Sequence, residues 1–267
     1  MYQYRCDLKT AVIKPLLKKQ SLDKNLLKIY RPISNLPFLS KSREKVVLHK
    51  LHSHPQENNL SNPFQSAYRA GHRTETVFLR NVNDILSAQD NNNFSLLLLL
   101  HLSAAFDPTD HQILLSRLNS VSGIQSTALQ WFQSCLSNRY QSASVNNSSS
   151  SPSQLMHGVP QGSVLGPILF VLYTTPLSNI IANHSVNHQL FADDTQLQKS
   201  APLSELTNLT KELDACADNI KTWMTENQLK LNDDKTEALL SLFVFLETFY
   251  RLPPRLDYSW LSQHPLL

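Results

Sequence analysis

One apolar run, residues 94–102, constrains the fold of this chain more than any other stretch. Its five consecutive leucines stand between three asparagines and His101. A continuous apolar run bounded by turn residues is typical of a strand that is buried on both faces. The run is far shorter than the roughly 20 apolar residues that cross a bilayer as a helix, so it predicts no membrane span. Because 41% of the 267 residues are apolar, the chain can bury a core, which excludes a wholly disordered polypeptide.

Strand and helix patterns alternate along the rest of the chain. Prolines at positions 15 and 32 favour extended backbone at the residue before each of them. Apolar spacing predicts helices, and two short strands flank Asp193 and Asp194 like a hairpin. The expected helices cover about residues 41–60, 74–90, 110–118, 126–136, 164–181 and 203–227, and the hairpin strands cover 188–191 and 195–197. Residues 146–153 predict a flexible surface loop from their Ser/Asn composition. The alternation predicts an α+β layered fold.

Charge is distributed unevenly, although the net charge is only +3. Residues 1–50 carry +9 and the remainder carries −6. This asymmetry favours a basic arm that faces a polyanion, and an ordinary solvated basic surface is the alternative.

The three cysteines have no CxxC spacing, so we expect neither a disulfide framework nor a zinc site. No signal peptide follows Met1, because Arg5, Asp7 and Lys9 interrupt the segment that should be apolar. The sequence therefore predicts a soluble, intracellular protein without a membrane partner.

Two local features carry chemistry. Asp193 and Asp194 place adjacent carboxylates at a predicted turn, where both can approach one ion, and hard cations such as Mg²⁺ prefer oxygen ligands. Taken alone, such a pair is more typical of a surface turn. Three of the five glycines, at positions 158, 162 and 166, lie in one short segment ahead of a predicted buried helix.

Six segments in a fixed order resemble the reverse transcriptase domain of LINE-type non-LTR retrotransposons, over about residues 10–240. They are YRPIS (30–34), QSAYRAGH (65–72), LSAAFD (102–107), GVPQGSVLGP (158–167), FADD (191–194), and LKLN with KTE (229–237).

The resemblance implies the fingers and palm of a right-hand polymerase, with a mostly antiparallel palm sheet covered by helices on one face. Residues 1–90 would be fingers-like, 91–240 the palm, and 241–267 a divergent tail with no assigned domain. The family's thumb would be absent. The implied activity is RNA-directed DNA polymerisation, in which a DNA primer on an RNA template attacks a deoxynucleoside triphosphate held with two Mg²⁺ ions.

The resemblance also implies residue roles. Asp193 and Asp194 would hold metal, and Arg31 and Lys41 would meet the triphosphate. The nucleotide pocket would be completed by Phe106, Gln161 and Gly162. Plainer interpretations stay open: surface cations for Arg31 and Lys41, a core ring for Phe106, a turn before a helix for 158–167, and a loop with a helix cap for 65–72.

One departure from the family pattern affects the expected chemistry. Position 101 holds histidine where the family's first catalytic motif begins with a metal-binding aspartate. An imidazole nitrogen suits transition metals better than Mg²⁺. Asp107 is too far along the strand to replace that ligand, and we expect Asp107 and Asp110 to cap the following helix.

We therefore predict that polymerisation is abolished or severely reduced. The alternative is a catalytically dead relic that at most binds nucleic acid. A further alternative is a host protein that uses the fold only as an interaction scaffold.

Overall fold

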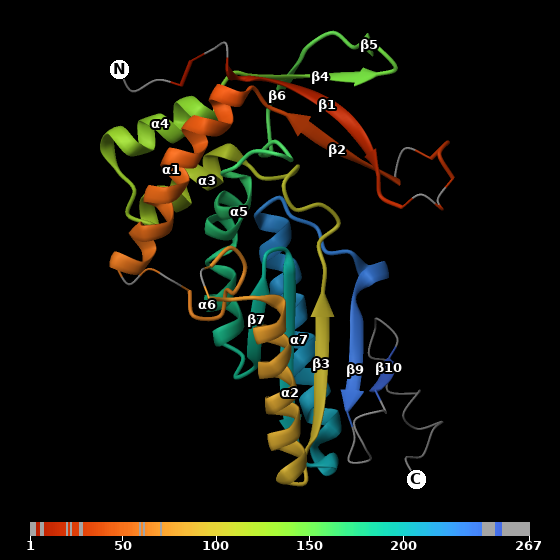
Figure 1. Ribbon diagram of the computed structural model, residues 1–267. Helices are drawn as coiled ribbons and strands as arrows, with labels where there is room; N and C mark the ends of the chain where they lie inside the picture. Colours follow the sequence, from red (N-terminus) through yellow and green to blue (C-terminus); the bar gives the residue numbers. More distant parts are fainter. Residues whose placement is uncertain are drawn as a thin grey trace. The chain divides into compact units, whose positions relative to one another are not determined.

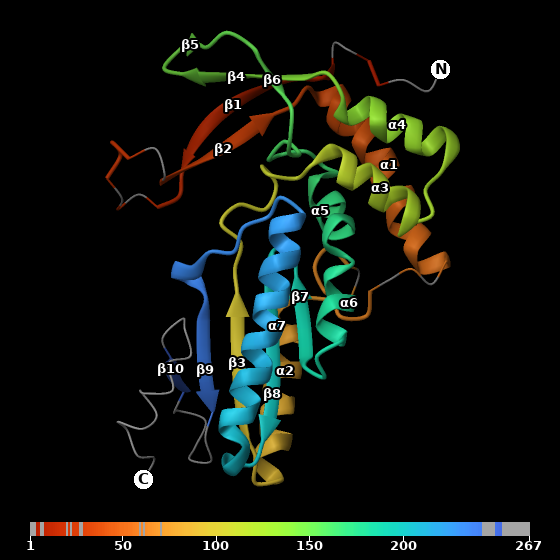
Figure 2. The ribbon, with the colours of Figure 1, turned by 180° about the vertical axis from the view of Figure 1, so that it is seen from behind.

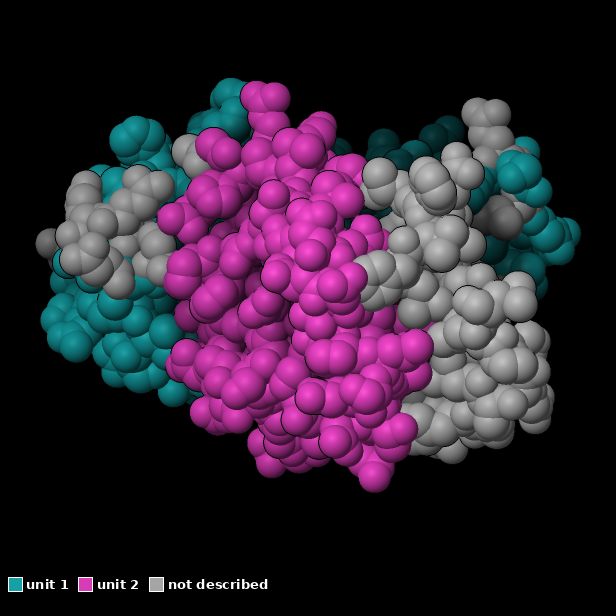
Figure 3. All heavy atoms as spheres, turned by 90° about the horizontal axis from the view of Figure 1, so that it is seen from below, with its two compact units in different colours: residues 1–61, 104–174 teal, residues 62–103, 175–267 magenta. Residues whose placement is uncertain are grey.

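The computed structural model describes residues 4–5, 8–19, 21, 23–26, 29–58, 60, 62–69, 71–241 and 249–252 (Figure 1). The chain forms two compact units, which Figure 3 colours separately. Unit 1 consists of Met1–Ser61 and Ala104–Thr174, and unit 2 consists of Asn62–Ser103 and Thr175–Leu267. The predicted functional division into 1–90, 91–240 and 241–267 is not tested by this grouping and stays a prediction.

Unit 1 contains a five-stranded sheet with the order β2-β1-β4-β5, in which β6 also pairs with β4. Strand β1 (Thr10–Leu17) pairs antiparallel with β2 (Tyr30–Asn35) and parallel with β4 (Arg139–Val145). The extended backbone predicted near the two prolines is confirmed, and Pro15 faces Pro32 in register. Pro15 lies beyond the part of β1 that pairs with β4, so its missing N–H removes no bond from that ladder.

The segment predicted as a flexible loop, 146–153, instead turns back on β4. Strands β5 (Ser148–Ser149) and β6 (Ser153–Leu155) both pair antiparallel with β4. Asn146 and Asn147 have φ of 49° and 65°, which suits a two-residue hairpin turn, and asparagine tolerates this conformation. Composition alone pointed to a loop because serine and asparagine are common in loops and in turns alike.

Three of the four helices in the described part of unit 1 lie where the sequence predicted helices. The three are α1 (Phe38–Glu57), α3 (His111–Ser120) and α4 (Ser126–Leu136), and the fourth is α5 (Gly166–Thr174). Asp110 caps α3 as predicted, because its Oδ1 accepts from the backbone N–H groups of Gln112 and Ile113 at 2.8 and 2.9 Å. The single helix predicted over 164–181 is wrong. A second helix, α6 (Leu177–Ala182), follows α5 after a break at Pro176, whose ring and missing N–H disrupt a continuous helix.

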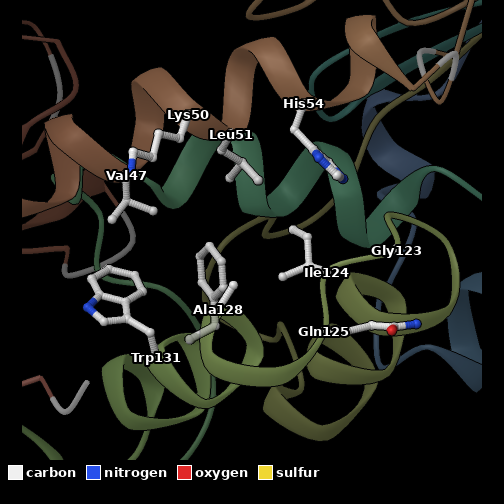
Figure 4. A pocket seen from close by; sticks show the side chains of 10 residues that line it. Val47, Lys50, Leu51, His54, Gly123, Ile124, Gln125, Ala128 and Trp131 are labelled. Atoms are coloured by element: carbon white, nitrogen blue, oxygen red, sulfur yellow. The ribbon is translucent and has the colours of Figure 1, made fainter. Parts of the chain in front are cut away.

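Helices α1 and α4 leave an apolar pocket of about 350 Å³ between them. Figure 4 shows Val47 and Leu51 of α1 on one side of this pocket and Trp131 of α4 on the other. At one end, the ring nitrogen Nε2 of His54 lies 2.6 Å from the carbonyl oxygen of Ser122. Ser122 lies between α3 and α4, so this contact ties α1 to the segment just before α4.

Unit 2 contains a second five-stranded sheet with the order β10-β9-β3-β8-β7, and every pairing in it is antiparallel. The strands are β3 (Phe94–Leu100), β7 (Asn187–Phe191), β8 (Asp194–Ala201), β9 (Glu237–Ser241) and β10 (Phe249–Leu252). The α+β class and the antiparallel sheet are confirmed, and the leucine run forms the central strand. Strand β10 lies in the predicted tail. The rest of that tail after Ser241 lies outside the described residues, so the expectation that it packs poorly stays a prediction.

Helices cover both faces of this sheet, which corrects the expectation of a single covered face. Helix α2 (Thr74–Asp90) lies on one face and α7 (Leu206–Glu226), preceded by the short helix η3 (Leu203–Glu205), on the other (Figures 1 and 2). The α2 face mixes polar and apolar side chains: Asn81 of α2 hydrogen-bonds to Gln196 of β8, and α2 also buries apolar residues such as Val77 and Ile85. Leu98 and its fully buried cross-strand partner Leu197 point to the opposite face. Because β3 is apolar in both directions, one helical layer would have left half of it in water.

None of the helices in the described ranges is long and apolar enough to cross a membrane. Within those ranges Cys135 and Cys216 are buried free thiols, and Cys6 lies outside them.

Candidate active site

The carboxylate pair sits on a tight hairpin in unit 2. Phe191 and Asp194 form the last pair of β7 and β8, so Ala192 and Asp193 make a two-residue loop. Ala192 has a φ of 57°, a left-handed conformation that a residue with a Cβ adopts at some energetic expense. The predicted hairpin is confirmed: Asp193 lies in its loop and Asp194 is the first residue of β8.

The pairing of β3 with β8 brings position 101 to the same place. Leu100 is paired with Thr195, so one further residue in the same register sets His101 opposite Asp194. His101 Nδ1 lies 2.6 Å from Asp194 Oδ1, with side-chain exposures of 34% and 44%. Since a carboxylate only accepts hydrogen bonds, Nδ1 is the donor, and one oxygen of Asp194 is engaged by the imidazole.

Asp193 stands in a mixed electrostatic environment. Burial and the adjacent Asp194 raise the pKa of Asp193 above its usual value, against the opposing effects of its own backbone N–H, His101 and Lys235. Lys235 belongs to the short helix η4 (Asp233–Lys235), within the KTE segment. Burial, with a smaller contribution from Asp193, likewise raises the pKa of Tyr68. Tyr68 of segment 65–72 and Lys235 of segment 235–237 therefore each lie within electrostatic reach of Asp193.

Gln65 supports the turn directly. Its buried side-chain oxygen accepts from the backbone N–H of Ala67 at 2.9 Å and of Ala192 at 3.3 Å. Backbone bonds between Ser66 and Leu190, and between Leu190 and Phe64, hold the two segments together. A plain loop with a helix cap leaves these contacts unexplained. Sequence reasoning missed the link because Gln65 and Ala192 are 127 positions apart.

These residues do not fit a site for two Mg²⁺ ions. In the described part of the chain, no group of three or more His, Cys, Asp or Glu side chains is arranged to hold a metal ion. The turn offers two carboxylates, and one oxygen of Asp194 is already hydrogen-bonded to His101. Two dications need several anionic oxygens, and an imidazole supplies neither charge nor an oxygen ligand.

The glycine-rich segment 158–167, here called the glycine loop, lies in unit 1. Its first part is tied to residues just ahead of α3: Gly158 donates to Thr109 O at 2.7 Å and Val159 to Phe106 O at 3.0 Å. Its middle is tied to β2, because Ser34 N donates to Gln161 O at 2.6 Å.

Glycine is required at two positions of this loop. Gly158 and Gly162 have φ of 83° and 119°, where side chains are strained. A Cβ would lie 2.6 Å from Asp107 O at the first position and 2.5 Å from Ser34 O at the second. The loop therefore approaches other backbone segments more closely than any side chain allows.

Unit 1 also carries the other predicted nucleotide-binding residues. The Phe106 ring packs against Phe170 with centroids 5.5 Å apart. Arg31 is exposed on β2, and Lys41 lies half-buried in the first turn of α1. Their binding roles stay predictions.

Asp107 does not cap α3, which corrects that expectation. Its two carboxylate oxygens instead accept from the Gln161 side chain at 3.2 and 3.3 Å. Asp110 alone caps the helix, because only its side chain reaches the free N–H groups of the first turn.

The profile of the family described as reverse transcriptase (RNA-dependent DNA polymerase) matches residues 17–263. The chain belongs to this family. The matched range includes most of the segment 241–267, which the sequence motifs had left unassigned. Its relatives include the RNA-directed DNA polymerase from mobile element jockey of Drosophila funebris, 31% identical over 85% of this chain, and a probable RNA-directed DNA polymerase from transposon BS of Drosophila melanogaster, 30% identical over 78%.

These relatives confirm a reverse transcriptase domain of the non-LTR retrotransposon type. The matches cover 25% and 23% of the two relatives, so this chain spans about a quarter of their length. Among solved structures, a truncated apo telomerase from Candida tropicalis superposes with a TM-score of 0.64 at 13% identity, covering 91% of this chain and 52% of the telomerase. The telomerase of that species in complex with a telomeric RNA fragment gives the same TM-score at 12% identity, with 89% and 42% covered. At such identity these structures show a shared fold.

Proposed function

We propose that this reverse transcriptase domain carries the machinery of RNA-directed DNA synthesis and that its polymerisation step is severely reduced by His101. With the family's aspartate at position 101, a divalent metal, Mg²⁺ by the family's chemistry, would be held by that residue together with Asp193 and Asp194. A deoxynucleoside triphosphate would bind at Arg31, Lys41, Phe106, Gln161 and Gly162. The nucleotide-binding group lies in unit 1 and the metal-binding group in unit 2.

The hydrogen bond from His101 to Asp194 is the observation that carries this proposal. The imidazole occupies the position of an anionic ligand and takes up one of the few carboxylate oxygens of the turn. Replacing a carboxylate with imidazole leaves two metal ions with less negative charge to offset their mutual repulsion. Removal of one electrostatic contact to a transition state typically lowers kcat by about 100- to 1,000-fold.

An RNA template and a DNA primer are the proposed partners. Lys14 and Lys19 on and beside β1, and Arg31 on β2, are exposed cations in the basic part of unit 1. Contacts of such residues with phosphates release counterions, so binding should weaken steeply as salt rises.

Primer extension on a poly(rA) template with an oligo(dT) primer and Mg²⁺ tests the proposal. We expect little or no product from the unmodified chain and at least about 100-fold more from the His101→Asp variant. His101→Asn is the matched control, because it also removes the imidazole but adds no carboxylate, and it should stay inactive. Robust extension by the unmodified chain would overturn the proposed impairment.

A second candidate is a relic that binds nucleic acid without catalysis. It is favoured by the same hydrogen bond, because the imidazole of His101 satisfies Asp194 without any cation. Equilibrium binding of a deoxynucleoside triphosphate with and without Mg²⁺ separates the two candidates. An impaired polymerase should restore metal-linked affinity when His101 becomes Asp, whereas a relic should bind RNA and show no metal dependence in either form.

A further inference from the structure

We infer that Glu44 of α1 is a positioning residue for the glycine loop: its buried carboxylate fixes the backbone of residues 163–165 and thereby the neighbouring Gln161 and Gly162. The inference rests on the proposed nucleotide-binding function of that loop. No sequence motif singled out Glu44, which looks like one more charged residue in a basic helix.

The carboxylate of Glu44 directs its hydrogen bonds at the loop. Glu44 is 0% exposed, and its Oε2 accepts from Ser163 Oγ at 2.8 Å and from Val164 N at 2.7 Å. The N–H of Leu165 points at the same oxygen from 3.4 Å. Because α5 begins at Gly166, this oxygen sits at the start of a helix, where N–H groups lack partners and negative charge is favourable.

A buried cation faces the other carboxylate oxygen. Arg139 is 3% exposed, and its Nη2 lies 3.6 Å from Glu44 Oε1. No described residue donates a hydrogen bond to Oε1, so the contact with Arg139 is one of charge rather than of hydrogen bonding. Arg139 makes its own hydrogen bond elsewhere, from Nε to Cys135 O at 2.6 Å. The hydrogen bonds that Glu44 makes to other segments are therefore directed to the loop and not to its ionic partner.

The pattern distinguishes positioning from simple stability. A buried ion pair is often no more stabilising than apolar side chains of similar size. An acid at this place is instead explained by three donors that need one fixed acceptor. Gly162 lies between this anchor at residues 163–165 and the bond from Ser34 N of β2 to Gln161 O, so loss of the Glu44 contacts would loosen one side of the Gln161–Gly162 pair.

Two substitutions at position 44 separate the effect of side-chain length from the effect of negative charge. Glu44→Asp keeps the negative charge near Arg139 but withdraws the oxygens from the loop by one methylene. Glu44→Gln keeps a carbonyl oxygen within reach of Val164 and Ser163 but removes the charge. Arg139→Met is the matched control, because it removes the cation and leaves every bond from Glu44 to the loop.

Amide hydrogen exchange on the full chain is the first measurement and needs no catalytic activity. We expect protection of the Val164 and Leu165 amides to fall about tenfold or more in Glu44→Asp and less than about threefold in Glu44→Gln. Arg139→Met should change these two amides no more than it changes the β1 amides. A larger loss in Glu44→Gln than in Glu44→Asp, or an equal loss throughout unit 1, would show that the residue serves charge pairing or overall stability.

Steady-state kinetics in the His101→Asp background supply the second measurement. With poly(rA) and oligo(dT), Glu44→Asp should raise the KM for dTTP about tenfold while kcat changes far less, and Glu44→Gln should recover most of the affinity. A KM that is unaffected by Glu44→Asp would overturn the inference. Inactivity of the His101→Asp chain would count against the proposed function instead, and the exchange measurement would still decide whether Glu44 holds the loop.

Discussion

The glycine loop of unit 1 and the carboxylate turn of unit 2 are held in different ways. The loop reaches its conformation with glycines at φ of 83° and 119°, and it is tied by backbone bonds and a buried carboxylate. The turn reaches its conformation with an alanine at φ of 57°, and its His101–Asp194 contact is half-exposed. In the loop, backbone space decides which residues are allowed. In the turn, the partly exposed hydrogen bond between His101 and Asp194 is what a side chain at position 101 must satisfy.

This difference explains how position 101, which we propose to be a lost ligand position, can carry a different side chain without a change of fold. The register between β3 and β8 sets position 101 opposite Asp194 whatever side chain it carries. The imidazole of His101 hydrogen-bonds to Asp194 and is partly exposed, so the sheet accommodates it. A comparable change in the loop would meet backbone atoms at once.

Gly158→Ala should give the largest effect. Its Cβ would lie 2.6 Å from Asp107 O and 2.9 Å from Phe106 O, and its φ of 83° is strained for alanine. We expect a loss of at least about 3 kcal/mol in the free energy of unfolding, measured by urea titration. Gly71→Ala is the control, since its φ is 77° with open space around the new Cβ. Equal losses in the two variants would show that backbone strain, and not close approach, sets the requirement.

His101→Asp should make stability depend on Mg²⁺. When a chelator has removed Mg²⁺ from the solution, a third carboxylate repels Asp193 and Asp194. A bound cation offsets that repulsion. Thermal unfolding should reveal a gain of about 2–3 kcal/mol when Mg²⁺ is 100 times its dissociation constant. The unmodified chain should gain less than about 0.5 kcal/mol by the same linkage. A strong Mg²⁺ response of the unmodified chain would contradict the poor fit of its residues to the metal.

The free energy of unfolding should fall as the pH is lowered, because of His188 on β7. Burial, with help from Arg80, lowers the pKa of His188 on β7 below its ordinary 6.5, although a backbone bond to Val186 opposes this effect. The unfolded chain then binds a proton more readily, so this contribution to stability is complete above pH 6.5 and is lost as pH falls through the lowered pKa. A histidine pKa that folding lowers by one pH unit contributes about 1.4 kcal/mol to the free energy of unfolding.

Urea titrations between pH 7.5 and 5 check this expectation. His188→Gln removes the titrating ring that lies 2.5 Å from Ser178 Oγ, and its stability should vary less over that interval. An unchanged pH dependence in His188→Gln would assign the effect to other groups.

Ala192→Gly should give the smallest change and the opposite sign to Gly158→Ala. Glycine adopts a φ of 57° without strain, but it also loses more freedom on folding. We expect a net stabilisation of no more than about 1 kcal/mol, measured by urea titration. Destabilisation by this change would mean that the turn relies on the alanine methyl group and is packed more tightly than its exposure suggests.

Local signals in the sequence predicted most helices and the central strand. The leucine run predicted β3, and the helix over 126–136 has the predicted bounds. The β4–β5 turn was missed because Asn146 and Asn147 signal a loop and a hairpin equally well. The break at Pro176 was missed because an apolar run on both sides of a proline resembles one buried helix.

For the candidate site, the sequence pattern predicted the aspartate turn and the family resemblance singled out position 101, but neither could predict the partner of that residue. The bond between His101 and Asp194 depends on a register between strands 93 positions apart. Glu44 and Gln65 were out of reach for the same reason, because each acts on a loop more than 100 positions away. Asp107 shows that short-range predictions can fail too, since an aspartate near the start of a helix can either cap the helix or accept a hydrogen bond from another side chain, here Gln161.

The parallel pairing of β1 with β4 bears on how the protein is made. Thr10 pairs with Tyr140, and the intervening stretch includes residues 62–103, which belong to the other unit. On the ribosome, β1 can pair with β2 soon after synthesis but must wait for more than 100 further residues before β4 emerges. Closing so long a loop is slow, and until β4 arrives the edge of β1 that pairs with it stays unpaired. Unit 1 therefore cannot complete its sheet before a strand and a helix of unit 2 have already left the ribosome.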